Sequence, residues 1–361
     1  MAERPGAEVM IRQVERLAAD LRDLTGIFGA RAAALLAPPR GERAEKVYLT
    51  GDGDSYHASC AAAMAFETIA DIACAPVSAL RFSEYGAQWM RPSAPDRTLV
   101  IAVSASGGTE RVLRAVERAR HHGAQTLAVT GTPGSAVTRE ACHSLVIGLP
   151  DTEPSPGIRS YQASLLGLLL IAIQLAQTRG RCSALAAERL RHELSALAEA
   201  VDATARAVKA SCRDLATVIA AAPVMAMVGS GPSYGSALFS AAKVVEGAGI
   251  PAIGQDLEEW CHVERHAGPA DMPVVVIAPP GRSHPIAADV AALARKLGRR
   301  VITVAQIGDT DLTRHADTVL PVHGGTREEF TPLLYHVFAS YLACFTAQRL
   351  GRAPFQMGRL S

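Results

Sequence analysis

The sequence predicts an α/β protein made of two tandem copies of one domain, each a parallel β-sheet flanked by helices in an αβα sandwich. Three observations support this prediction. Short apolar runs rich in β-branched residues alternate with helical stretches, which is typical of parallel sheets covered on both faces. The same segments recur in the second half of the chain at nearly constant spacing. The length of 361 residues is about twice that of an average domain.

Three pairs of segments carry the repeat. In chain order they are residues 47–56 and 225–234, 98–103 and 273–278, and 136–142 and 311–317. The members of these pairs are offset by 178, 175 and 175 residues. Each match is modest alone, but three matches in the same order indicate that one fold has been duplicated.

The alternation of elements is clearest in the first half. Strands are expected at the four apolar runs 46–49, 98–103, 126–129 and 144–147. Between them, residues 108–121 form an amphipathic pattern that predicts a helix. Two further helical segments, 8–36 and 183–209, flank the first copy. The resulting division is an N-terminal helical segment (1–44), a first domain (45–180), a helical linker (181–219), a second domain (220–345) and a C-terminal tail (346–361).

The composition argues against several classes of protein. A formal net charge of +1 gives no electrostatic footprint for nucleic acid or an anionic membrane. The N-terminus mixes charges with apolar residues, unlike a signal peptide, and the apolar run 165–175 is too short to span a bilayer. Seven scattered cysteines without a Cys-x-x-Cys pair indicate reduced thiols. We therefore expect a cytoplasmic protein with no metal, no cofactor, and no nucleic acid or membrane partner.

Two loops of the first half can carry chemistry, because ligands of open parallel sheets bind where strands end. One is Gly51-Asp-Gly-Asp-Ser-Tyr56. The other is Ser104-Ala-Ser-Gly-Gly-Thr109, called the hydroxyl loop below, which places three hydroxyls and two glycines at a helix N-terminus. Exposed amides and the helix dipole favour a phosphate there. Alone, such a stretch is more often an ordinary helix cap, but its position after an apolar strand favours phosphate binding.

These loops resemble those of the sugar isomerase (SIS) domain family. The hydroxyl loop is similar to the family's S-x-S-G-x-T, residues 53–56 to its G-T-S-Y, and residues 134–140 to its G-S-x-L-x-R-E. In the second half, residues 229–246 resemble the G-R-G-x-x-Y and L-K-x-K-E stretches of the isomerase domains of glucosamine-6-phosphate synthases. Residues 259–262 resemble their E-L-K-H. The resemblance runs through nearly the whole chain and extends to related deaminases and fructosamine deglycases.

The resemblance implies a role for each matching residue. The implied substrate-binding residues are Ser55, Ser104, Ser106, Gly107, Gly108 and Thr109 around the phosphate, with Asp54, Ser160 and Glu259 also contacting the substrate. Glu246 would be the base that moves a proton between C1 and C2 of an open-chain sugar, His262 would assist ring opening, and Lys243 would lie near the sugar oxygens. Aldose–ketose interconversion needs such a carboxylate and a second group at the ring oxygen. The family also implies a homodimer whose partner contributes to a shared active site.

Several positions depart from the family pattern. Asp54 stands in place of a threonine, where its charge would repel a phosphate unless it is paired or points away. Ala105 stands in place of a glutamine, and Tyr161 in place of a lysine. Residues 353–361 lack the lysine of the family's closing segment, and no glutamine-hydrolysing domain is matched. Isomerisation, or C–N cleavage as in the deaminases and deglycases, is therefore favoured over amination, and the identity of the sugar stays open.

The second half lacks a hydroxyl-rich loop. Its counterpart, Ala278-Pro-Pro-Gly-Arg-Ser283, contains prolines that remove amide donors. We therefore expect one sugar site per chain, formed by the first domain and capped by groups from the second.

Four other interpretations compete with this one. Lys243 and Glu246, three residues apart, are also typical of a surface ion pair on a helix. Ser233 lies in a G-x-S-x-G pattern like that of a serine hydrolase, although the first copy repeats this loop. His262 and His266 could form a metal pair, but no third ligand is evident. Finally, the chain could be a non-catalytic sugar-phosphate sensor.

Overall fold

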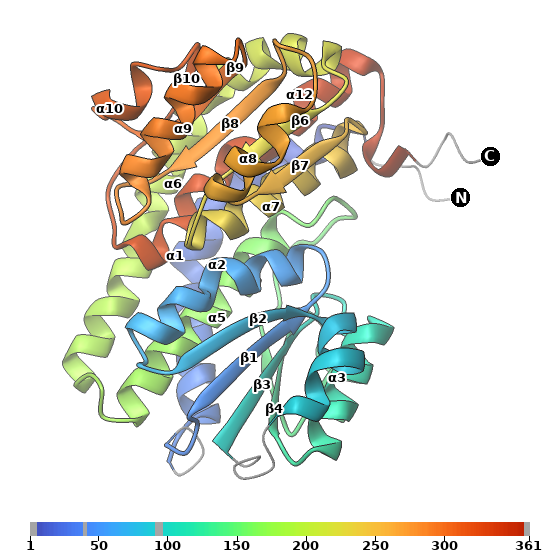
Figure 1. Ribbon diagram of the computed structural model, residues 1–361. Coiled ribbons are helices and arrows are strands. Elements are labelled where there is room, and N and C mark those ends of the chain that lie inside the picture. The colour runs from blue at the N-terminus through green and yellow to red at the C-terminus, as the bar shows by residue number, and fades with distance from the viewer. Residues whose placement is uncertain (1–5, 39–41, 91–96, 357–361) are drawn as a thin grey trace. The chain divides into compact units, whose positions relative to one another are not determined.

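The computed structural model describes residues 6–38, 42–90 and 97–356 (Figure 1). The chain forms two compact units. The first-sheet unit comprises residues 19–151 and 159–196, and the second-sheet unit comprises residues 1–18, 152–158 and 197–361. Each unit contains one five-stranded sheet among its described residues.

The first sheet has five parallel strands in the order β2-β1-β3-β4-β5. The strands are β1 Lys46–Gly51, β2 Ala73–Ser78, β3 Thr98–Val103, β4 Gln125–Thr130 and β5 His143–Val146. All four predicted strands are present. β2 was not predicted, because its sequence ACAPVS contains Pro76 and has only one β-branched residue, Val77. A proline is compatible with β2 because this strand lies at the edge of the sheet.

The second sheet repeats the first. Its strands are β6 Met225–Val228, β7 Ala252–Gln255, β8 Pro273–Ala278, β9 Arg300–Gln306 and β10 Thr318–Val322, in the order β10-β9-β8-β6-β7. When β6 to β10 are matched in chain order to β1 to β5, the two strand orders are the same and all pairings are parallel. The predicted duplication into two separate parallel sheets is confirmed.

Helices cover both faces of the first sheet (Figure 1). They are α2 Asp54–Thr68, α3 Glu110–His121, the short α4 Ala136–Glu140 and α5 Arg159–Thr178, with a π-helix η1 Arg81–Gly86 and a 3-10 turn η2 Ala87–Trp89 after β2. On one face, Val112 and Val116 of α3 pack in a cluster with Val100 of β3. On the other face, Gly167 of α5 lies so close to Ile147 that a Cβ would be 3.0 Å from its side chain. Burial on both faces explains why β3 is apolar from Leu99 to Val103.

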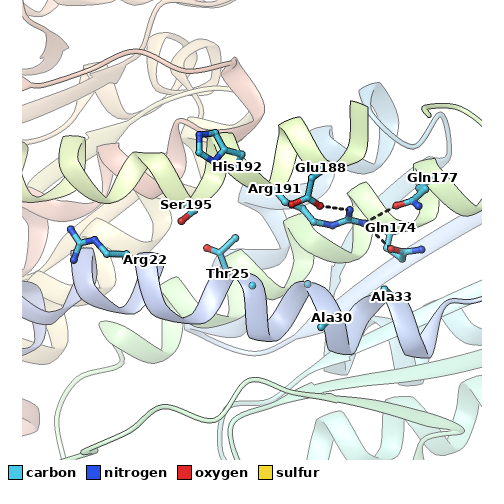
Figure 2. Close-up of a pocket in the computed structure, with 12 residues that line it drawn as sticks. Arg22, Thr25, Ala30, Ala33, Gln174, Gln177, Glu188, Arg191, His192 and Ser195 are labelled. Atoms are coloured by element: carbon cyan, nitrogen blue, oxygen red, sulfur yellow. Dashed lines mark hydrogen bonds and ion pairs between the residues drawn. The ribbon is translucent and has the colours of Figure 1, made fainter. Parts of the chain in front are cut away.

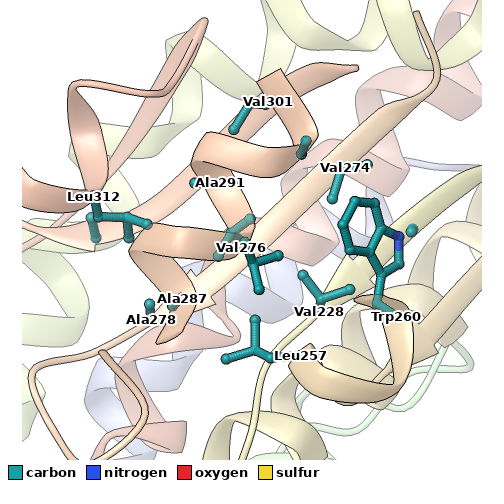
Figure 3. Packing of buried hydrophobic residues seen from close by; sticks show 14 of the residues in the cluster. Val228, Leu257, Trp260, Val274, Val276, Ala278, Ala287, Ala291, Val301 and Leu312 are labelled. Carbon is teal, nitrogen blue, oxygen red and sulfur yellow. The ribbon is translucent and has the colours of Figure 1, made fainter. Parts of the chain in front are cut away.

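The second sheet is covered in the same way. α7 Pro232–Ala248 and α12 Val337–Leu350 pack together. Figure 3 shows the cluster in which Trp260 and Leu257 of α8 (Leu257–His262) pack with Val228, Val274 and Val276 of the sheet and with α9 (His284–Lys296). Shorter elements complete this unit: η4 Glu264–His266, α10 Thr310–Thr313, η5 Glu328–Phe330, α11 Pro332–Tyr335 and η6 Pro354–Gln356.

Two long helices contribute residues to both units. They are α1 Val9–Leu35 and α6 Ala184–Ala221. Both flanking helices predicted from the sequence are therefore present, and α6 extends twelve residues beyond the predicted end at 209.

The apolar run 165–175 lies inside a longer helix, α5. At 20 residues α5 is long enough to cross a membrane by length and composition, as are residues 328–350, although the run itself was expected to be too short. In both cases most of the apolar window is buried inside the protein, 89% and 100% respectively. This burial is typical of core helices.

The seven cysteines are free thiols, and burial raises the pKa of Cys60 to about 11.

Candidate functional site

The predicted site residues fall into two groups, one in each unit. The first-sheet unit holds the residues expected to bind phosphate, on the loops that follow β1 and β3 and at the start of α5. The second-sheet unit holds those expected to carry out the proton transfer, on α7 and α8.

The hydroxyl loop forms a compact turn between β3 and α3. The hydroxyl oxygens of Ser104 and Thr109 lie 3.1 Å apart. The Gly107 amide donates to Ser104 Oγ at 3.1 Å, and the Gly108 amide lies 3.4 Å from Ser106 Oγ. The loop thus gathers three hydroxyls and two amides at the N-terminus of a 12-residue helix. Amides at such a position are suited to an anion.

Thr109 does not cap its own helix. It occupies the N-cap position of α3, yet its side chain makes no cap hydrogen bond. Its hydroxyl instead faces Ser104. The ordinary helix cap, which was the main alternative for this sequence, is therefore not what the loop forms.

Ser135 closes one side of the hydroxyl loop. Gly107 has φ +68°, and a Cβ there would lie 2.0 Å from Ser135 Oγ, so only glycine fits. The Gly107 carbonyl accepts from the Val137 amide at 2.9 Å. Ser135 Oγ is buried and has no hydrogen-bond partner among the described residues. A buried hydroxyl without a partner is costly, so Ser135 is a further candidate ligand for an anion in this loop.

The β1–α2 turn brings Ser55 beside the end of β3. Gly51 packs so closely that a Cβ would lie 2.8 Å from Ser55 Cβ and 3.0 Å from the Val103 carbonyl. Since Val103 immediately precedes the hydroxyl loop, Ser55 lies close to the start of that loop.

Asp54 is paired with a histidine on its own helix. Asp54 Oδ1 lies 3.6 Å from His57 Nδ1, and the two side chains are only 18% and 15% exposed. Asp54 is also the first residue of α2, where a carboxylate interacts favourably with the helix dipole. The carboxylate that departs from the family pattern is thus held at the same sheet edge as the hydroxyl loop.

Ser160 lies in the first turn of α5, next to a buried ion pair. Arg159 donates to both carboxylate oxygens of Asp20 in α1, at 2.6 and 2.8 Å, and also to the Asp151 carbonyl. The two charged side chains are 2% and 6% exposed. This bidentate contact fixes the start of α5 and with it the half-buried Ser160. Tyr161, in place of the family's lysine, is buried in the core.

In the second-sheet unit, Lys243 and Glu246 form an ion pair on α7. Lys243 Nζ lies 2.5 Å from Glu246 Oε2. Lys243 is 0% exposed, whereas the Glu246 side chain is 31% exposed. The simple surface ion pair weighed above is therefore wrong for Lys243, because a fully buried lysine needs its partner. The Glu246 carboxylate remains accessible to a ligand.

Glu259 and His262 lie on α8 and are exposed. Asp256 caps this helix by accepting from the Glu258 amide at 2.9 Å. His262 Nε2 lies 2.9 Å from Glu258 Oε1, and the His262 side chain is 69% exposed. His262 therefore presents its ring at the surface of α8.

Two alternative chemistries lose support from the geometry. Ser233, the candidate hydrolase nucleophile, is 2% exposed, whereas a nucleophile elbow presents its hydroxyl. Within the described residues no cluster of three histidine, cysteine or acidic side chains could hold a metal. His266 contacts its neighbour Arg265 at 3.1 Å.

The loop of the second sheet that corresponds to the hydroxyl loop carries a carboxylate. The Arg282 amide donates to both carboxylate oxygens of Glu328, each at 3.3 Å. A Cβ on Gly281 would lie 2.5 Å from Glu328 Cδ. Together with Pro279 and Pro280, this negative side chain makes the loop unsuited to a phosphate.

A separate cavity of about 560 Å³ lies in the first-sheet unit along α1, α5 and α6 (Figure 2). Arg191 forms one wall and donates to Gln174 at 2.9 Å and Gln177 at 2.8 Å. Small residues of α1 such as Ala30 and Ala33 line the opposite side. None of the predicted site residues lines this cavity.

With this geometry in view, the protein is a member of the SIS domain family, which matches residues 42–174 and 219–347. Among curated proteins, it is 29% identical over 359 residues to the glutamine–fructose-6-phosphate aminotransferase (isomerizing) of Symbiobacterium thermophilum, covering 97% of this chain and 58% of that protein. The chain spans about half the length of the curated relatives it matches.

Two solved structures show the same fold. The C-terminal domain of glucosamine-fructose-6-phosphate aminotransferase from Francisella tularensis superposes with a TM-score of 0.84 at 16% identity, covering 96% of this chain and 97% of that one. Glucosamine-6-phosphate deaminase from Thermotoga maritima superposes with a TM-score of 0.72 at 18% identity, covering 96% of both chains.

Proposed function

We propose that this protein is a phosphosugar enzyme. It catalyses aldose–ketose isomerisation, or cleavage or formation of a C–N bond on an aminosugar or fructosamine phosphate, through an open-chain enediol or enaminol. The observation that carries the proposal is the hydroxyl loop, where Thr109 faces Ser104 instead of capping α3. The buried, unpartnered hydroxyl of Ser135 beside Gly107 supports an anion at the same place.

In this proposal the roles of the residues follow their chemistry. Ser55, Ser104, Ser106 and Thr109 hold the phosphate, with the amides of Gly107 and Gly108. Glu246 moves the proton between C1 and C2, a task that suits a carboxylate accessible to substrate and held in place by a buried ammonium. His262 handles the ring oxygen. No metal or other cofactor takes part.

We further propose one sugar site per chain and a cytoplasmic homodimer. The carboxylate of Glu328 against Arg282 disfavours a second phosphate site. The high exposure of His262 leaves its ring available to a partner subunit, as the shared active site requires.

A sugar-phosphate sensor without catalysis is the second candidate. It would need the hydroxyl loop but not the Lys243–Glu246 pair. Lys243 is fully buried and paired with the partly exposed Glu246 carboxylate. This pairing favours the enzyme, because a lysine is rarely buried without a specific need.

The experiment that separates these possibilities incubates the protein with a panel of phosphosugars and fructosamine phosphates. Products are identified by mass spectrometry, and ammonia release is measured in parallel. Isomeric products without ammonia indicate an isomerase, and ammonia or free amine indicates C–N cleavage. Binding of a phosphosugar without any turnover would support the sensor and overturn the proposed enzyme.

A further inference from the structure

In the second-sheet unit, three buried side chains contact one another in sequence, and one of them, Lys243, forms the ion pair with Glu246. Lys243 Nζ lies 5.1 Å from the ring centroid of Phe239, one turn earlier on α7. The Phe239 ring meets the imidazole of His336 edge to face, with centroids 5.3 Å apart and planes at 88°. Phe239, Lys243 and His336 are each 0% exposed.

This arrangement gives the buried ammonium of Lys243 two favourable contacts. One is the Glu246 carboxylate at 2.5 Å, and the other is the face of the Phe239 ring. A cation over an aromatic face is stabilised by the ring quadrupole, and more strongly when it is desolvated. The second contact depends on the orientation of the Phe239 ring.

His336 holds that ring from a different element. It lies at the junction of α11 and α12 and occupies the N-cap position of α12 without a side-chain cap bond. Its edge-to-face contact with Phe239 is the favoured geometry for an aromatic pair. A smaller residue at 336 would leave a cavity beside Phe239, which would let the ring turn.

We propose that His336 is a positioning residue for the reaction: through Phe239 it fixes Lys243, and through Lys243 it fixes the Glu246 carboxylate. The inference rests on the proposed function, in which Glu246 is the base. A small displacement of a catalytic group lowers turnover while leaving substrate binding largely intact.

The test is a double-mutant cycle in turnover between His336→Ala and Lys243→Met. Alone, His336→Ala should lower kcat about ten- to a hundredfold with little change in KM. In the Lys243→Met background the same substitution should have almost no further effect on kcat. His336→Phe, which restores an aromatic edge against Phe239, should recover most of the activity. Phe338→Ala, a buried aromatic truncation two residues along, controls for general loosening of α12 and should act equally in both backgrounds.

The free energy of unfolding of each variant is measured in urea as well. Variants that are too unstable to fold are thereby distinguished from folded variants with a lower kcat. If the parent enzyme is active but His336→Ala lowers kcat by the same factor with and without Lys243, His336 acts independently and the inference is wrong while the proposed function stands. Failure of His336→Phe to recover activity also contradicts it. If the parent turns over no phosphosugar, the proposed function fails, and the positioning role fails with it.

Discussion

Gly53 and Gly231 hold the same backbone conformation at equivalent places in the two sheets. Their φ and ψ angles are 53° and −130° in the first case and 58° and −133° in the second. Each precedes the helix that follows the first strand of its sheet. The duplication thus extends to the dihedral angles of single residues.

Substitution of either glycine by alanine should destabilise the protein for conformational reasons alone. A Cβ at Gly53 or Gly231 would meet no atom within 4 Å, but the backbone angles are those that side chains disfavour. We expect a loss of roughly 1–3 kcal/mol in the free energy of unfolding for each variant, measured by urea denaturation. Gly26→Ala is the matched control, because its Cβ also meets nothing but lies in helix α1. It should be neutral or stabilising. Equal behaviour of all three variants would contradict the explanation.

The hydroxyl loop should discriminate between phosphorylated and unphosphorylated sugars. Ser106→Ala and Thr109→Ala should each weaken a phosphosugar by roughly 1.5–3 kcal/mol, the range for a hydrogen bond to a charged group. The parent unphosphorylated sugar should be affected far less. Titration calorimetry measures both, with Thr68→Ala at the far end of α2 as the control. If the affinity for both sugars fell equally, the loop would have a structural role and would not bind phosphate.

Asp54 should weaken phosphate binding in the natural protein. Asp54→Asn keeps the shape of the side chain and removes a charge that is 18% exposed and lies at the edge where phosphate is proposed to bind. The variant should bind a phosphosugar tighter by about 1 kcal/mol, roughly fivefold in Kd. Asp23→Asn, on the exposed face of α1, is the control. A weaker affinity in Asp54→Asn would show that the carboxylate contacts the sugar favourably, and an unchanged affinity would show that its pairing with His57 offsets its charge.

The strands of the first sheet show what the sequence could predict. Runs such as β3, buried along its whole length, are visible because burial on both faces requires apolar residues throughout. The edge strand β2 was missed, since edge strands tolerate proline and small residues. Its counterpart β7, with the sequence AIGQ, is equally weak as a pattern.

The candidate site was predictable where its residues lie on one loop. The hydroxyl loop and Ser55 follow strands, and the rule for parallel sheets brings strand ends together. Ser135 and His336 carry no such signal, because their neighbours Gly107 and Phe239 are distant in sequence. The full burial of Lys243 also could not be predicted from the sequence, because a lysine three residues before a glutamate has the same spacing in an exposed surface pair.

A shared active site should reveal itself by complementation. Glu246→Gln and His262→Ala variants should each be inactive or nearly so. When mixed under conditions that allow subunit exchange, they should recover part of the activity, because some hybrid sites then contain both native groups. Exchange is verified by native mass spectrometry. If exchange occurs and activity does not return, both residues act within one chain and the dimer has no part in the chemistry.

The most direct test of the proposed mechanism is hydrogen exchange at C1 or C2 of a bound phosphosugar in D₂O, followed by NMR. Isomerisation and C–N cleavage both pass through an enediol or enaminol, so the test does not depend on which reaction is the natural one. The protein should catalyse deuterium incorporation, and Glu246→Gln should slow it by about 10²–10⁴ with ligand binding largely intact. Incorporation at an undiminished rate in Glu246→Gln, with binding confirmed, would contradict the assignment of Glu246 as the base.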